Sequence, residues 1–334
     1  MLRSVTDIVP QFDIFLLDQF GVLHNGLSAL PGAIDAVKYL CENKTVVVCS
    51  NSSQRKELAV SRWTAMGFPQ EVEFLTSGDV SREFLVSSSD SRGWSKVFVF
   101  GWENPLLTSN YLEGLPLTRV SSPDQADFLL FHGPETCGEH SISLGDTGLL
   151  DEIPAQTLAR AASLGLPAVC ANVDMKAVSA SNIVRYMPGN LAKAYEAMGG
   201  KVFSFGKPSR EFFGMALEKA VSKIKAASPN SADEYLLLRN GNAGQRSLPK
   251  TGVRRLRAIH VGDSLEHDVA GAHASSIDSL LITRHGIHKD ELDEEINKNS
   301  DGEETPSLLL RAVIGVCKKE NAKPPTFILP EFRL

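Results

Sequence analysis

Short apolar runs alternate along most of the chain with segments in which apolar residues recur at helical spacing. The apolar runs predict buried strands at residues 12–17, 45–49, 97–100, 128–131, 168–171, 202–205, 258–261 and 278–282. Helical periodicity follows in segments such as 54–66 and 307–317. Strands that alternate with helices indicate βαβ units around a largely parallel sheet. We therefore predict an α/β fold.

Several of the predicted strands end in polar residues that can carry chemistry. Asp18 follows the first strand, and Ser50 and Asn51 follow the second. Lys207 comes just before a helix that begins at Pro208, and the strand at 258–261 ends in Gly-Asp263. Parallel strands bring their carboxyl ends to one edge of a sheet, where open α/β proteins bind ligands. The sequence thus predicts one site built from four separate segments.

Each of these residues alone has an ordinary structural explanation, as a turn residue, a helix cap or a solvated lysine. Together they fit phosphoryl transfer. A carboxylate such as Asp18 can accept a phosphoryl group as an aspartyl-phosphate. A hydroxyl and backbone amides at a helix start hold the phosphoryl oxygens. Lys207 offsets their negative charge, and a hard divalent ion binds the carboxylate oxygens of Asp18 and Asp263.

Four segments resemble the motifs of the haloacid dehalogenase-like (HAD) superfamily, in the order usual for that family. They are FLLDQFGVLHNG, VVVCSNSS, FGKPSREFF and IHVGDSLEHDVAGA. The long stretch between the second and third motifs is similar to the large α/β cap of subclass IIA. The resemblance implies a Rossmann-like core with a parallel sheet and an inserted α/β cap domain.

The resemblance also implies roles around a bound Mg²⁺. Asp18 corresponds to the nucleophile and to a metal ligand, and Phe20 lends its backbone carbonyl to the metal. Asp263 binds Mg²⁺ directly or through water, and Asp268 supports the metal site.

Further residues correspond to the phosphate and substrate contacts of the family. Ser50 hydrogen-bonds the transferring phosphoryl oxygens, Asn51 helps through its backbone amide or its side chain, and Lys207 steadies the negative charge. In the cap, Asn172 and Asp174 match a segment that often faces the substrate. This chain has valine between those two residues, where the family usually has proline.

Phe20 departs from the pattern of the family's phosphatases, which carry a second aspartate at that position. That aspartate protonates the leaving oxygen and later activates water, and such help is typically worth ~10²–10⁴-fold in rate. A phenylalanine does neither. His24, on the following turn, is an alternative proton donor and otherwise a turn residue. Carbon–halogen cleavage is disfavoured, because the dehalogenases do not use the metal whose acidic ligands this chain keeps.

The length of 334 residues suits two domains, or one domain with a large insertion. We expect the core to comprise residues 1–77 and 206–334 and the cap to comprise residues 78–205. Residues 228–255 are rich in Asn, Gly, Ser and Arg and predict a flexible loop inserted in the core.

Composition excludes several classes of partner. A net charge of −6 argues against a nucleic-acid surface. No apolar stretch is long enough to predict a membrane span. The five scattered cysteines form no CxxC pair and favour a reducing compartment. The cytoplasm is the expected location, with import into an organelle left open. Caps of this type often mediate dimers in the family, which makes a homodimer an open expectation.

The sequence therefore predicts a Mg²⁺-dependent hydrolase that acts on a small phosphorylated metabolite through an aspartyl-phosphate at Asp18. Two alternatives stay open. One is a catalytically degenerate member that only binds its ligand or a protein partner. The other is a phosphonatase or phosphotransferase variant, since members of the superfamily with those activities also lack the acid that Phe20 replaces here.

Overall fold

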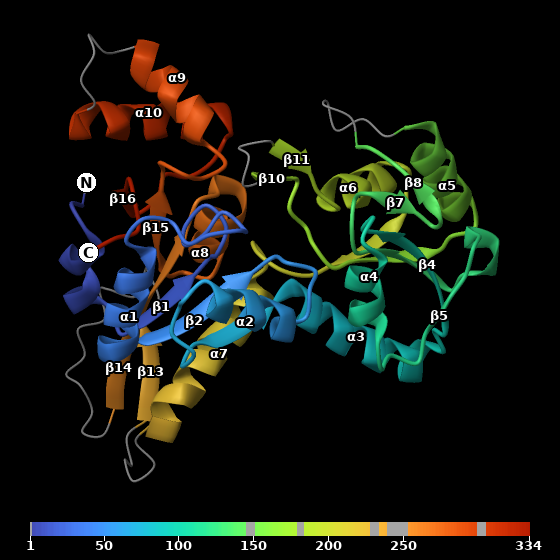
Figure 1. The fold of residues 1–334 in the computed structure, drawn as a ribbon, viewed down its shortest axis with the longest axis horizontal. Helices are drawn as coiled ribbons and strands as arrows, with labels where there is room; N and C mark the ends of the chain where they lie inside the picture. The colour runs from blue at the N-terminus through green and yellow to red at the C-terminus, as the bar shows by residue number, and fades with distance from the viewer. Residues whose placement is uncertain (1, 145–150, 179–183, 228–233, 239–252, 299–304) are drawn as a thin grey trace.

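The computed structural model describes residues 2–144, 151–178, 184–227, 234–238, 253–298 and 305–334. Its strands form two separate sheets of seven strands each and a small two-stranded sheet. Figure 1 shows the elements of one large sheet on the left and those of the other on the right. We call them the core sheet and the cap sheet. The prediction of an α/β fold with a parallel core sheet is confirmed.

Every pairing in the core sheet is parallel. Its strands in spatial order are β16 (Phe327–Leu329), β15 (Asp278–Ile282), β14 (Val253–Gly262), β1 (Ile14–Leu17), β2 (Thr45–Ser50) and β3 (Glu73–Thr76), with β13 (Glu234–Leu238) paired to β14. β1 lies between β14 and β2, with Leu17 opposite Val261 on one side and Val48 on the other. The ends of β14, β1 and β2 are therefore neighbours.

Helices cover both faces of the core sheet, because successive side chains of a strand point to opposite faces. On one face Phe15 and Leu17 pack with α1 (Ala33–Asn43) and α2 (Lys56–Ala65). On the other face Ile14 and Leu16 pack with α7 (Arg210–Ala227) and α8 (Ala270–Ala274). The hairpin of α9 (Lys289–Lys298) and α10 (Pro306–Lys319) packs against η4 (Leu265–Val269), a turn of π-helix that directly precedes α8.

The cap sheet lies between β3 and α7 in the sequence. Its strands in spatial order are β12 (Lys201–Ser204), β9 (Pro167–Cys170), β6 (Phe128–Phe131), β4 (Lys96–Gly101), β7 (Thr136–Cys137) and β8 (His140–Ser141), with β5 (Thr118–Arg119) paired to β4. One face packs against α5 (Glu152–Ser163) and α6 (Gly189–Ala197), and the other against α3 (Ser77–Arg92) and α4 (Pro105–Leu112). β10 (Lys176–Val178) and β11 (Val184–Tyr186) form the separate antiparallel pair.

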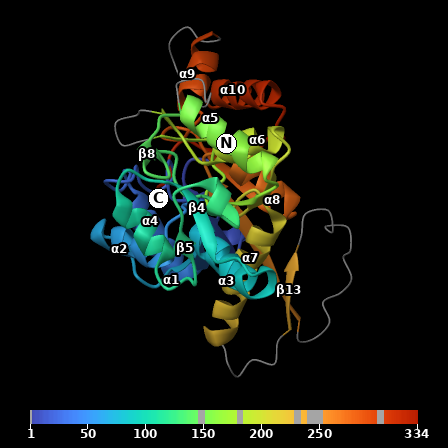
Figure 2. The same cartoon turned by 90° about the vertical axis from the view of Figure 1, so that its right-hand side faces the viewer.

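The apolar runs did not predict eight of the strands in the described residues, namely β3, β5, β7, β8, β10, β11, β13 and β16. Residues 234–238 form β13, which pairs with the first half of β14, whereas the sequence predicted a loop over 228–255. β13 borders the core sheet in Figure 2. Residues 228–233 and 239–252 of that predicted loop lie outside the described residues. In the cap, β7 pairs antiparallel to β4, which the pattern of apolar runs did not reveal.

Candidate active site

Asp18, Ser50 and Asp263 meet at the carboxyl edge of the core sheet. Asp18 directly follows β1, Ser50 ends β2, and Asp263 directly follows β14. The amide of Asp18 donates a hydrogen bond of 2.8 Å to the carbonyl of Val261, which continues the pairing of the two strands to their ends. All three polar residues are buried. The sequence prediction that separate strand ends come together is therefore met by the geometry of the sheet.

Lys207 joins this edge from the segment between the two sheets. Its Nζ lies 2.6 Å from Oδ1 of Asp18 and 2.7 Å from Oδ1 of Asp268. Asn51 fixes the backbone of the lysine, because its Oδ1 accepts from the Lys207 amide at 2.7 Å and its Nδ2 donates to the Lys207 carbonyl at 3.1 Å. One lysine thus pairs with two buried carboxylates.

Gly206 is required for this approach of the chain. Its φ of +122° is a backbone conformation that favours glycine. A Cβ atom at this position would lie 2.5 Å from Oδ1 of Asn51 and 2.8 Å from Oγ of Ser77. The hydroxyl of Ser77 also donates to the carbonyl of Phe205. The two chain segments that lead into and out of the cap are therefore in direct contact beside Lys207.

Burial and charge set the protonation of the cluster. Burial raises the pKa of Asp18 to about 7, although the Lys207 ammonium lowers it in part. Burial and the neighbouring Asp18 raise the pKa of Asp263 well above its usual range. Burial alone would raise the pKa of Asp268 too, but Lys207 and His260 outweigh that effect and lower it. Burial alone would lower the pKa of Lys207, but the carboxylates of Asp18 and Asp268 outweigh burial and raise that pKa.

Oxygen atoms of Asp18, Asp263 and Asp268 all lie within 4.8 Å of one another. A set of carboxylate oxygens suits Mg²⁺, which is a hard cation. The cluster also concentrates three acidic groups in a buried place, and a divalent cation would offset their charge. The residues present therefore fit the magnesium site that the sequence predicted.

Asp268 also accepts hydrogen bonds within the protein that the sequence did not predict. Its Oδ1 accepts from Lys207 and, at 2.7 Å, from Nε2 of His260. Its Oδ2 accepts from the amides of Asp263 and Ser264 at 3.1 and 3.0 Å. Both oxygens are thus bonded within the protein, and Asp268 holds Lys207 and the turn after β14 in place. Its contribution to metal binding stays a prediction.

Asp263 is oriented by the loop after β15. The amide of Ile287 donates to its Oδ2 at 3.0 Å. Gly21, with φ +72°, faces the same oxygen, and a Cβ atom at Gly21 would lie 2.2 Å from it. No chemical role was predicted for the segment around Ile287, and the structure shows that it positions Asp263, a predicted metal ligand.

Phe20 and His24 pack on each other, with ring centroids 4.7 Å apart in a T-shaped arrangement. Nδ1 of His24 accepts from the amide of Gly26 at 3.1 Å, and Nε2 lies 3.3 Å from Oε1 of Gln19. Burial lowers the pKa of His24 to about 4. Both ring nitrogens are engaged inside the loop, so the geometry disfavours His24 as the alternative proton donor. The backbone role predicted for Phe20 stays a prediction.

The cap contributes Asp174 to the same site. Its Oδ1 accepts from Nδ2 of Asn51 at 2.8 Å and lies 3.7 Å from Nε2 of His267. Asn172 is buried beside it, and its Oδ1 accepts from the Asp174 amide at 2.9 Å. The weak sequence match at Asn172 and Asp174 therefore falls on a segment in contact with the core.

The predicted phosphate contacts divide into two groups. The Oγ of Ser50 is buried and accepts from the amide of Ser52 at 3.2 Å. The side chain of Asn51 forms hydrogen bonds with Lys207 and Asp174. Of the two groups predicted to help at Asn51, the backbone amide is therefore the one that remains a candidate for binding phosphate. Phosphate binding by Ser50, Asn51 and Lys207 stays a prediction.

The sequence did not predict the hydrogen bond between His260 and Asp268. His260 lies in the predicted strand at 258–261 and is fully buried, and its Nε2 donates to Asp268. Burial lowers the pKa of His260 despite that carboxylate. A histidine in an apolar strand needs a polar partner, and that requirement was the available signal.

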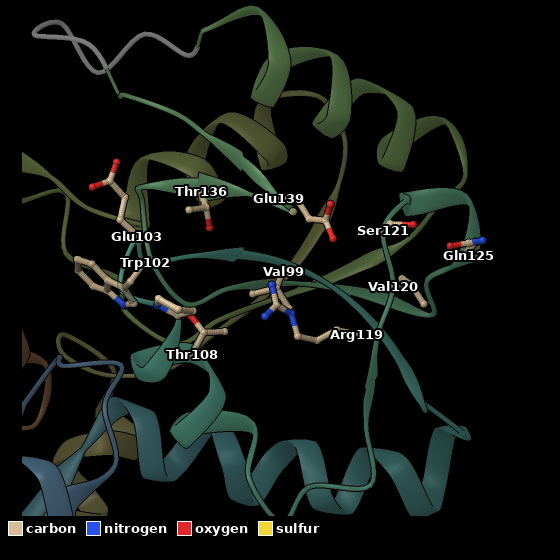
Figure 3. Close-up of a pocket in the computed structure, with 12 residues that line it drawn as sticks. Val99, Trp102, Glu103, Thr108, Arg119, Val120, Ser121, Gln125, Thr136 and Glu139 are labelled. Atoms are coloured by element: carbon tan, nitrogen blue, oxygen red, sulfur yellow. The ribbon is translucent and has the colours of Figure 1, made fainter.

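A separate cavity of about 620 Å³ lies in the cap, at the edge of β4 between β5 and the β7–β8 hairpin (Figure 3). Its lining includes Trp102, Arg119 and Glu139, all from the cap. In Figure 3 the side chains of Arg119 and Glu139 extend toward the same space. Because its lining comes from the cap alone, this cavity is distinct from the site around Asp18.

Two family models match this chain. Residues 15–109 match the model described as haloacid dehalogenase-like hydrolase, and residues 204–302 match the model described as HAD-hydrolase-like. The matches contain the strand ends at Asp18, Ser50 and Asp263 and the cluster around Lys207. With an α/β unit inserted between them, this is the arrangement of subclass IIA. The chain belongs to the haloacid dehalogenase-like superfamily.

Solved structures share the fold. A possible sugar phosphatase of Cytophaga hutchinsonii is 17% identical, with a TM-score of 0.65 over 99% of this chain and 98% of that chain. A haloacid dehalogenase-like hydrolase from Brucella suis is 22% identical, with a TM-score of 0.62 over 87% and 92%. A glycerol phosphate phosphatase of Mycobacterium tuberculosis in complex with magnesium is 18% identical, with a TM-score of 0.55 over 99% and 78%.

A putative NipSnap protein of Caenorhabditis elegans is 28% identical over 106 residues. The match covers 30% of this chain and 20% of that protein, so this chain aligns with about a fifth of its relative. In the part of the chain that the structure describes, none of the helices is both long and apolar enough to span a membrane.

Proposed function

We propose that this protein is a Mg²⁺-dependent phosphoric monoester hydrolase that acts on a small phosphorylated metabolite. The observation that carries the proposal is the cluster in which Lys207 pairs with Asp18 while Asp263 and Asp268 stand beside it. The phosphatases among the solved structures with this fold support the same class of reaction.

Each residue of the site has its own role in the proposed reaction. Asp18 attacks phosphorus, the bond from phosphorus to the ester oxygen breaks, and that oxygen takes up a proton and leaves as the alcohol. Asp18 then carries the phosphoryl group as an aspartyl-phosphate, with Lys207 offsetting the negative charge. Ser50 and the amide of Asn51 hold the phosphoryl oxygens. Mg²⁺ held by Asp18 and Asp263 would supply further compensation of phosphate charge. Water then hydrolyses the acyl-phosphate and returns the Asp18 carboxylate.

Phe20 favours a second candidate function, in which the site binds a phosphorylated ligand without turnover. The aromatic ring packs on His24 and offers no proton where the family's phosphatases have one. The two functions make opposite predictions for any phosphate ester, so one assay separates them.

The test is Mg²⁺-dependent release of phosphate from p-nitrophenyl phosphate by wild type and by Asp18→Asn. The hydrolase requires turnover in wild type and its loss in Asp18→Asn, whereas Asp35→Asn, a change at an exposed position on α1, leaves the rate unchanged. Absence of turnover together with saturable binding of phosphate ions supports the binding function instead.

Three further assignments complete the proposal. We propose domain boundaries at 77/78 and 205/206, because β3 and β14 belong to one sheet and β4 and β12 to the other. We propose the cytoplasm as the compartment, because all five cysteines are free thiols. We also propose that the chain can form a homodimer, which sedimentation of the purified protein tests.

A further inference from the structure

The site around Asp18 lacks a group at Phe20 that could protonate the oxygen of a departing alcohol. We propose that Asp174 of the cap is the catalytic acid and base of this enzyme. This inference rests on the proposed hydrolase function and adds the residue that moves the proton.

The contact between Asp174 and Asn51 places the carboxylate beside the phosphoryl site. Asn51 follows Ser50 in the chain, and its side chain binds both Asp174 and the backbone of Lys207. Lys207 in turn contacts Asp18 at 2.6 Å, so Asn51 links Asp174 to the nucleophile through one residue. The carboxylate is therefore close to the reacting groups without being one of the groups paired with Lys207.

The position of Asp174 in the cap also suits protonation of the leaving oxygen. In phosphoryl transfer the leaving oxygen departs roughly in line with the attacking oxygen and on the opposite side of phosphorus. Asp18 attacks from the end of β1 in the core, so the leaving oxygen points away from the core sheet. Asp174 follows β9 of the cap sheet and faces the site from the cap. Its side chain is 28% exposed, which leaves it open to a substrate.

Other groups around the nucleophile are already engaged. Both oxygens of Asp268 accept hydrogen bonds, and Asp263 is held by Ile287 next to the predicted metal position. The ring nitrogens of His24 are bonded within its own loop. Among the described acidic residues, Asp174 is the one that faces the site from the cap and keeps exposed surface.

The two half-reactions balance with one proton passing through Asp174. In the first, Asp18 bonds to phosphorus, the bond from phosphorus to the ester oxygen breaks, and the protonated Asp174 carboxyl gives its proton to that oxygen. The alcohol leaves, and Asp174 remains as a carboxylate. In the second, Asp174 takes a proton from water, the water oxygen bonds to phosphorus, and the bond to Asp18 breaks. Hydrogen phosphate leaves, and both carboxyl groups return to their starting states.

A series of esters with different leaving groups tests this role. Wild type and Asp174→Asn are compared on p-nitrophenyl phosphate, phenyl phosphate and glycerol phosphate. Asp174→Asn should lose about 10²–10⁴-fold in kcat/KM for the poor leaving group, glycerol, because alkoxide departure needs a proton. The first step with p-nitrophenyl phosphate should change little, since nitrophenolate leaves without one. Asp124→Asn, an equivalent change at an exposed cap position, should lower none of the rates.

A second readout does not depend on the leaving group. Since Asp174 also serves the hydrolysis step, Asp174→Asn mixed with p-nitrophenyl phosphate should release one nitrophenol per active site in a burst. The aspartyl-phosphate at Asp18 should then accumulate, and mass spectrometry of the quenched protein detects it. The double variant Phe20→Asp with Asp174→Asn should regain turnover of glycerol phosphate, which also shows that the variant chain folds.

The outcomes separate this inference from the proposed function. An equal loss on all three esters, or no loss, overturns the role of Asp174 and leaves the hydrolase function standing. Failure of wild type to turn over any ester overturns the hydrolase function and the inference with it. A loss that grows as the leaving group becomes poorer supports both.

Discussion

The ammonium nitrogen of Lys207 lies 2.6 Å from a carboxylate oxygen of Asp18, and the lysine side chain is only 3% exposed. A cation buried this deeply is stabilised by the carboxylates that it contacts, and those carboxylates depend on it in turn. Removal of either partner would therefore leave a buried charge without its counter-charge.

Lys207→Met should destabilise the protein by roughly 3–5 kcal/mol without metal, because it leaves buried carboxylates without their cation. Urea unfolding at neutral pH measures the effect. Lys193→Met, a change at an exposed lysine of α6, serves as the control and should cost little. Added Mg²⁺ should return part of the lost stability. Unchanged unfolding of Lys207→Met would contradict the pairing described for this cluster.

Gly206→Ala should lower both stability and activity. The positive φ and the contacts of 2.5 and 2.8 Å that its Cβ would make force either Asn51 or Ser77 to move, at a cost of about 1–3 kcal/mol. Gly214→Ala is the matched control, because this glycine lies within α7 with open space around its Cβ. That change should stabilise the helix by about 0.5–1 kcal/mol, measured by thermal unfolding. Equal effects of the two changes would contradict a strained position at Gly206.

The stability of the protein should depend on pH through His132, which burial in the cap keeps neutral. Its pKa is lowered to about 3 from an ordinary 6.5. Between these values the unfolded chain binds one more proton at this residue than the folded chain, so stability falls as pH falls. When the pH falls from 6.5 to 5, the titration of His132 should lower the free energy of unfolding by about 2 kcal/mol.

Comparison of variants isolates that contribution from the acidic groups, which titrate in the same range. His132→Asn should flatten the pH dependence of the unfolding free energy between pH 6.5 and 5 relative to wild type. His140→Asn changes an exposed histidine and should leave the dependence as it is. A parallel pair of curves for wild type and His132→Asn would show that His132 titrates normally.

Phe20→Asp should raise turnover of an unactivated ester by up to about 10²–10⁴-fold, because it restores an acid where the family's phosphatases have one. Phe20→Asn removes the same ring without adding an acid and should give no such gain. Steady-state rates with glycerol phosphate measure the difference. An equal response to the two substitutions would indicate that the ring itself, rather than the missing acid, limits the rate.

The sequence predicted those parts of the fold that local pattern encodes. The apolar run before Asp18 and the β-branched run before Ser50 became buried strands of one parallel sheet, because each run is as long as a strand and ends at a turn. β7 was missed because its two residues are too few to form a pattern, and β13 was missed because it lies within a polar stretch that predicts a loop.

The same distinction separates the parts of the candidate site. The residues at strand ends could be found because parallel topology alone brings them to one edge. The hydrogen bonds from Asn51 to Asp174 and from His260 to Asp268 could not be found, because they depend on the packing of cap on core and on the direction of a side chain. Sequence pattern gives the elements, whereas these contacts are properties of the assembled chain.

The hydrogen bond from Ser77 to the carbonyl of Phe205 has a consequence for protein engineering. It means that the exit from the core and the return to it lie side by side, so the two chain connections of the insert are adjacent. Exchange of the insert for that of a relative therefore demands no new spacer and no rearrangement of the recipient sheet. Chimaeras joined at these two residues keep Asp18, Lys207 and Asp263 and replace Asp174, so they test how substrate preference and proton transfer depend on the insert.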